Sequence, residues 1–103
     1  AFDLEVPGQF TVEVKFDPAS QRTGNIVVEY YHRKVSGLHI STADWWVFDT
    51  GERCIWLTRA AVHQCIVNEG LQPVKIQGPG DRHPKWVFLV PVDQLDRYSS
   101  EAP

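Results

Sequence analysis

The first part of the chain alternates apolar and polar residues, and the alternation pauses only at Pro7-Gly8-Gln9. On either side of that pause, apolar side chains recur at every second position, from 2 to 6 and again from 10 to 16. A period of two is typical of a β-strand with one buried face, and turn residues between two such runs indicate a hairpin. We therefore predict a β-hairpin between the N-terminus and residue 16.

The turn chemistry of this hairpin fixes its register. In a two-residue loop, Pro7 would need a positive φ, which its ring forbids. A three-residue loop that ends at Gln9 is allowed, and it pairs Leu4 with Val12. Because directly opposed residues share a face of the sheet, we expect the apolar residues of the hairpin on one buried face and its charged residues on the other.

The rest of the chain predicts further strands and one long helix. A polar loop at 17–25 precedes a nearly continuous run of β-branched and aromatic residues at 26–31, which is typical of a central strand covered on both faces. Apolar residues at helical spacing run from Thr58, a favourable N-cap, to Gly70, which suits the position after a helix. The remaining patterns predict strands at 45–48, 54–57, 74–76 and 86–90, and a last helical turn at 92–98. These elements predict a single α/β domain over residues 1–103, with a mixed central β-sheet and flanking helices.

Composition narrows the class of protein. The chain has 103 residues, of which 43% are hydrophobic and 22% charged, so it carries enough apolar material for one core. No apolar run approaches the ~18 residues that span a bilayer, which excludes a membrane protein of that kind. Two cysteines are too few to staple a secreted domain, so we expect an intracellular, cytoplasmic protein. The net charge of −3 gives no general support for nucleic-acid binding, which must therefore depend on local clusters of Lys and Arg.

The predicted hairpin register also gathers charged side chains. It places Asp3 opposite Glu13 and puts Lys15 two positions along the same face. Neighbouring carboxylates repel each other unless a cation or a proton lies between them, and hard oxygen ligands suit Mg²⁺ or Mn²⁺. Such an ion lowers the pKa of bound water, and a nearby lysine can orient that water for phosphodiester hydrolysis. Spacing alone leaves open the alternative that these residues form an ordinary solvated sheet face.

The same residues carry a resemblance to a known family. Asp3 followed by Glu13-Val14-Lys15 resembles the D…(D/E)xK signature of the PD-(D/E)XK nuclease superfamily. The segments TVEVKFD, TGN, VVEYY, SGL and TADWW, all in the first half of the chain, together resemble a small phage or bacterial branch of it. The resemblance implies a restriction-endonuclease-like fold and a Mg²⁺-dependent (or Mn²⁺-dependent) endonuclease that acts on DNA.

The resemblance also implies roles for individual residues. Asp3 and Glu13 would be metal ligands, the carbonyl of Val14 a further ligand, and Lys15 the catalytic base. Glu29, in the VVEYY segment, would be an accessory acid or a structural hydrogen-bonding group. Members of this fold usually have a helix before the first strand, often with another acidic residue, whereas this chain begins directly on the predicted strand. We therefore expect a homodimer or a partner segment to supply the missing N-terminal helix and to cover the apolar face of the hairpin.

Polar and basic residues near the predicted site are candidates for binding nucleic acid. They are Arg22, Asn25, Arg33, Lys34 and Ser36. Side chains of these types make most phosphate contacts in nucleic-acid complexes, although a charged loop can equally serve solubility alone. The alternative function is therefore a non-catalytic module that keeps the nuclease fold and binds nucleic acid or protein.

Overall fold

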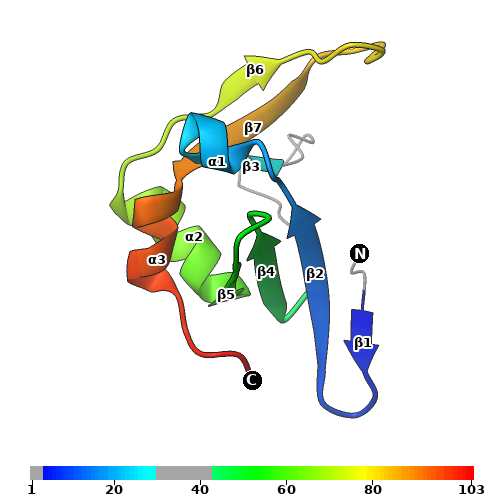
Figure 1. Cartoon of the computed structure of the whole chain (residues 1–103), viewed down its shortest axis with the longest axis vertical. Helices are drawn as coiled ribbons and strands as arrows, with labels where there is room; N and C mark the ends of the chain where they lie inside the picture. The colour runs from blue at the N-terminus through cyan, green and yellow to red at the C-terminus, as the bar shows by residue number, and fades with distance from the viewer. Residues whose placement is uncertain (1–3, 30–42) are drawn as a thin grey trace.

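The computed structural model describes residues 4–29 and 43–103, which form two β-sheets and three helices (Figure 1). The elements of the four-stranded sheet are β1 (Leu4–Val6), β2 (Phe10–Phe16), β4 (Trp45–Asp49) and β5 (Cys54–Thr58). The elements of the three-stranded sheet are β3 (Asn25–Glu29), β6 (Val74–Ile76) and β7 (Lys85–Pro91). The helices are α1 (Ser20–Thr23), α2 (Arg59–Asn68) and α3 (Val92–Tyr98). The chain is thus a mixed α/β fold, as its sequence predicts.

The four-stranded sheet contains the predicted hairpin in the predicted register. Its strand order is β1-β2-β4-β5, and β1 pairs antiparallel with β2 so that Leu4 lies opposite Val12. The three-residue turn closes when the N–H of Gln9 donates to the carbonyl of Val6, 2.9 Å away, and Gly8 adopts a φ of 72°. The next pair, β2 and β4, is parallel, whereas β4 and β5 are antiparallel. The sheet is therefore mixed, and β2 lies at its centre beside a strand that is remote in sequence.

The prediction of a central strand at 26–31 is wrong for the residues that the structure describes. Strand β3 forms one edge of the second sheet, whose order is β3-β7-β6, and both strand pairs in it are antiparallel. Along β3, Ile26 and Val28 are buried, while the residues between and beside them are half-buried. One face of β3 therefore lies in the core, and its other face is only partly covered. Tyr30 and Tyr31 lie outside the described residues, and the predicted polar loop at 17–25 contains the short helix α1.

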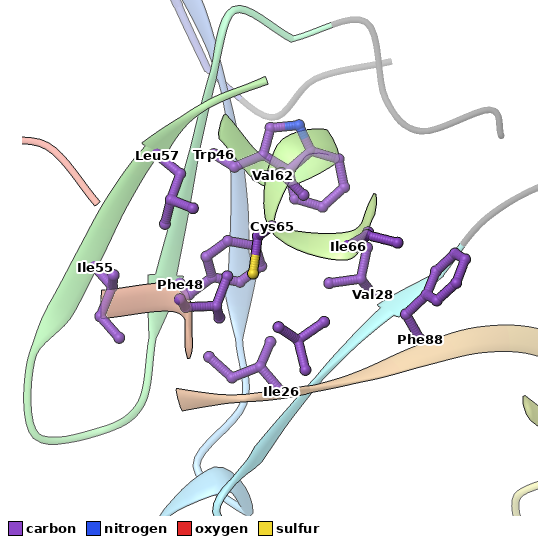
Figure 2. Packing of buried hydrophobic residues seen from close by; sticks show 12 residues of the cluster. Ile26, Val28, Trp46, Phe48, Ile55, Leu57, Val62, Cys65, Ile66 and Phe88 are labelled. Atoms are coloured by element: carbon purple, nitrogen blue, oxygen red, sulfur yellow. The ribbon is translucent and has the colours of Figure 1, made fainter. Parts of the chain in front are cut away.

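The core lies between α2 and the two sheets. Figure 2 shows Val62, Cys65 and Ile66 of α2 facing Trp46 and Phe48 of β4 and reaching the side chains of the second sheet. The predicted helix limits are confirmed: the hydroxyl of Thr58 accepts the N–H of Ala61 at 3.1 Å, and Gly70 follows the helix with a φ of 65°. None of the helices formed by residues 4–29 and 43–103 has the length and apolarity needed to cross a membrane.

The core lies on the face of the first sheet that the sequence assigned to charged residues. Register pairs Glu13 with Trp46 and Lys15 with Phe48, and paired residues share a face. Helix α2 contacts β4 and β5, so it packs on that same face. The expectation that the apolar face of the hairpin is buried is therefore only partly right, because Leu4 there is 57% exposed. Helix α2 packs on the large side chains of β4. The alternating pattern of the hairpin alone does not determine which face of the sheet the helix covers.

Candidate functional site

The candidate site centres on Glu13 and Lys15 in the middle of β2. The two residues are separated by one position, so their side chains leave the strand on the same face. Their neighbours on β4, Trp46 and Phe48, are 2% and 0% exposed. Glu13 and Lys15 themselves are half-buried. A carboxylate and an amine thus lie half-buried at the margin of the apolar core, on the face that carries Trp46 and Phe48 and not on the fully exposed face that the sequence predicted.

Neither charge has a polar partner in the part of the chain that the structure describes. Within that part, Glu13 is the only carboxylate residue that is neither exposed nor hydrogen-bonded, and Lys15 is the only Lys or Arg that is not exposed. Partly buried charges normally find a partner, because removing a charge from water is costly. A half-buried charge that the protein leaves unmatched is a candidate for binding something else.

The strand that carries these residues is held at its first half by a polar clamp. The backbone N–H and the hydroxyl of Thr11 donate to one carboxylate oxygen of Asp44, at 3.0 and 3.3 Å. In return, the hydroxyl oxygen of Thr11 accepts the N–H of Asp44 at 3.0 Å. This reciprocal contact holds the start of β4 against β2 at Thr11, two residues before Glu13. It therefore keeps the parallel register that sets Glu13 beside Trp46.

A second polar joint follows the last residue of β2. The N–H of Asp17 donates to the carbonyl of Asp49 at 2.9 Å, and its own carbonyl accepts the hydroxyl of Ser20 at 2.7 Å. The carboxylate of Asp17 accepts the N–H of Val27, on β3, at 3.2 Å. Asp17 thus joins the two sheets two residues after Lys15. Sequence reasoning treated Asp17 as loop, although an aspartate directly between a strand and a proline is a frequent hydrogen-bonding position.

An unmatched donor occupies the register position next to Glu13. The indole Nε1 of Trp46 is buried and has no hydrogen-bond partner among the described residues. Figure 2 shows this nitrogen on the side of the ring that points away from Phe48 and the rest of the cluster. Buried N–H groups are rarely left unsatisfied, and each exception calls for an explanation. A carboxylate and an N–H donor without partners therefore occupy paired positions on adjacent strands.

Glu29 does not join Glu13 and Lys15 in this arrangement. It belongs to β3 in the other sheet, and its carboxylate accepts from the Nζ of Lys85 at 3.2 Å. Both side chains are partly exposed, at 37% and 45%. Of the two roles that the sequence left open for Glu29, the structural one agrees with this contact.

The remaining predicted site residues fall into two groups. Arg22 is exposed at the end of α1, and Asn25 is half-buried at the start of β3, where its N–H donates to the hydroxyl of Thr23 at 3.2 Å. Val14 lies between Glu13 and Lys15 on β2 and is half-buried. The others lie outside the described residues: Asp3, Arg33, Lys34 and Ser36.

The donor set can be compared with what a hard divalent ion requires. Mg²⁺ in proteins is bound through one or two carboxylates and keeps several waters. The carboxylate of Glu13 is available for such a contact, since no described group bonds to it. Residues 4–29 and 43–103 contain no cluster of three or more His, Cys, Asp or Glu side chains suited to a metal. The described residues thus supply one carboxylate without a bonding partner and no complete set of metal ligands.

Searches against models of protein families, against curated proteins and against solved structures returned no match for this chain. The functional interpretation therefore depends on the residues and their arrangement.

Proposed function

We propose that this chain is a metal-dependent nuclease that hydrolyses phosphodiester bonds in DNA, with Mg²⁺ or Mn²⁺ as its cofactor. The observation that carries the proposal is the pair Glu13 and Lys15, half-buried side by side on β2 and without polar partners among the described residues. A stable sheet face gains nothing from two such unmatched charges. A metal ion and a phosphate diester would satisfy both.

The proposed ligands of the metal are the carboxylates of Asp3 and Glu13, with the carbonyl of Val14 as a further donor. The register that pairs Leu4 with Val12 supports this set, because it is the register from which Asp3 is expected opposite Glu13. When bound, the ion would polarise a phosphoryl oxygen and lower the pKa of a coordinated water.

Lys15 has a separate role in the proposed reaction. Its amine lies on the same face as Glu13, so in its unprotonated form it can accept the proton that the attacking water loses, and the ammonium that results lies beside the phosphate. The water oxygen forms a bond to phosphorus, the bond from phosphorus to the leaving oxygen breaks, and the leaving oxygen takes up a proton from solvent. Trp46 pairs with Glu13 in the register, so its indole N–H, unpartnered among the described residues, can donate to the Glu13 carboxylate and orient that ligand.

The mixed sheet is consistent with the fold that the proposal requires. An antiparallel hairpin joined to a parallel neighbour places Glu13 and Lys15 on a central strand, flanked by a helix on the same face. We propose that this arrangement is restriction-endonuclease-like. The exposure of Leu4 and of Phe16, at 57% and 68%, agrees with a homodimer or a partner segment that covers the opposite face.

A plasmid-nicking assay with and without Mg²⁺ or Mn²⁺ tests the proposal. We expect metal-dependent nicking by the wild-type chain, and a loss of at least about a hundredfold for Glu13→Gln and for Lys15→Ala, since each removes a group that acts on the reacting atoms. Glu52→Gln is the matched control, because Glu52 is an exposed carboxylate on the β4–β5 turn, and nicking by this variant should be unchanged.

Undiminished nicking by Glu13→Gln would contradict the assignment of the site. If the wild-type chain cleaves nothing in either metal but still binds DNA, the non-catalytic binding module becomes the better description. Circular dichroism of each variant distinguishes loss of chemistry from loss of fold.

A further inference from the structure

The hairpin formed by β6 and β7 presents an aromatic ring and a cation together. Trp86 is 40% exposed, which is unusual for the largest apolar side chain. Lys75 lies opposite it in the register, with its Nζ 5.8 Å from the centre of the indole ring. This distance is within the range of a cation–π interaction. The contact orders the lysine beside the ring and leaves much of the ring surface open.

The same hairpin concentrates positive charge in an acidic chain. Between residues 74 and 86 there are three basic side chains, one histidine and only one acid, while the whole chain has a net charge of −3. Arg82 and His83 in the connecting loop are exposed. Lys85 is 45% exposed, although it also bonds to Glu29. Local clustering of this kind provides the positive face that a phosphate backbone requires.

The single acid of the hairpin is used to order the loop. The carboxylate of Asp81 accepts the N–H of Gly78 at 2.7 Å, and the carbonyl of Asp81 accepts the side-chain amide of Gln77 at 3.0 Å. These bonds join residues 77 and 78 to residue 81, so they order the first part of the loop, and the carboxylate of Asp81 bonds to the loop's own backbone. The basic residues that follow are presented from an ordered turn, which lowers the entropic cost of binding.

We infer that the β6–β7 hairpin binds an unpaired segment of the nucleic acid, with one base stacked on Trp86 and adjacent phosphates held by Lys75 and Arg82. Aromatic rings combined with basic side chains are the usual means of binding single strands, because every base offers a ring face when it is not paired and stacked in a duplex. This inference rests on the proposed function and refines it, since it names the form of substrate that the nuclease would hold.

The position of the hairpin suits this role. Figure 1 shows its tip at the upper end of the molecule, the end toward which β2 runs, and away from α2 and α3. Asp17, which follows β2, bonds to β3, and β3 pairs with β7. The hairpin is therefore connected through a short path of hydrogen bonds to the strand that carries Glu13 and Lys15.

Fluorescence anisotropy with a labelled oligothymidylate, in EDTA so that no cleavage occurs, tests the inference directly. Trp86→Ala should weaken binding to the single strand by about five- to a hundredfold, which is the usual effect of losing one stacked base. Binding to a duplex of equal length should change less than about twofold by the same reasoning. Lys75→Ala and Arg82→Ala should each lower the slope of log affinity against log salt by about 0.7.

Leu89→Ala is the matched control, because Leu89 is 39% exposed on the opposite face of the same strand. Its affinity for the single strand should equal that of the wild type, and Trp86→Phe should retain most of it. Wild-type binding by Trp86→Ala, equal losses in Leu89→Ala, or no affinity of the wild type for the single strand would each overturn the inference. Because the assay contains no metal, these outcomes are independent of whether the chain cleaves DNA in the nicking assay.

Discussion

Asp17 offers the sharpest test of how the two sheets are joined. Its carboxylate accepts the N–H of Val27 from the edge strand β3, while its backbone bonds to Asp49 and Ser20 on the other side. The substitution Asp17→Ala removes only the first of these contacts, since the others use backbone groups of Asp17. The variant therefore isolates the bond between the sheets.

The expected magnitude follows from the environment of Val27. This residue is half-buried, so its N–H would lose its acceptor in a place where water reaches it poorly. Leaving such a donor unsatisfied costs about 1–3 kcal/mol. For a chain of this size, that cost corresponds to a fall in melting temperature of about 5 to 20 °C.

Urea unfolding followed by circular dichroism measures this loss. Asp17→Asn is the appropriate control, because its amide oxygen can still accept the N–H of Val27, and it should lose less than half as much free energy of unfolding. A loss below about 0.5 kcal/mol for Asp17→Ala would refute the reasoning, since that is the range of surface substitutions that affect no specific contact. It would mean that packing, rather than this bond, holds β3 in place.

Three further outcomes can be measured on the purified chain. Burial raises the pKa of the Cys65 thiol to about 11, so near neutral pH only the exposed Cys54 should react with a thiol reagent, and the second thiol should react once urea unfolds the chain. Thr58→Ala should lower the free energy of unfolding by about 1 kcal/mol, which Thr58→Ser should largely restore in urea titrations. The hydrogen bond from Arg53 holds the pKa of the Asp96 carboxyl below its usual range, so this pair stabilises the fold above the pKa of the unfolded carboxyl and ceases to do so as the pH falls through the lowered value. Asp96→Asn should consequently reduce the dependence of the melting temperature on acid pH. At neutral pH it should change the free energy of unfolding by no more than about 1 kcal/mol, because the side chains of Arg53 and Asp96 are exposed.

The features that could be predicted from sequence are those that short segments decide. Proline at position 7 excludes a two-residue turn, and the period of two then determines that Leu4 meets Val12. The helix after Thr58 carries its own start and stop signals. The closeness of Glu13 and Lys15 likewise follows from strand geometry alone.

The features that sequence did not predict depend on residues far apart in the chain. An apolar run at 26–31 predicts a strand but cannot say how many neighbours it has, and the second sheet forms only because β3 meets β7. The alternation of apolar and charged residues in the hairpin distinguishes two faces but does not show which one α2 covers. That depends on Trp46 and Phe48 of β4, on which the helix packs. In the same way, the bond of Lys85 to Glu29 could not be read from the residues around Glu29.

The parallel pairing of β2 with β4 has a consequence for how the protein is made. The hairpins β1–β2 and β4–β5 join strands that are neighbours in sequence, so they can form quickly. Strands β2 and β4 are far apart in sequence and can pair only after all the residues between them have been synthesised. During synthesis the surface with Glu13 and Lys15 therefore remains incomplete until β4 has left the ribosome, because Trp46 and Phe48 form half of it. A nascent or truncated chain that ends before β4 has both charged residues but not the apolar side chains beside them, so under the proposed function it should be unable to hold a substrate phosphate there.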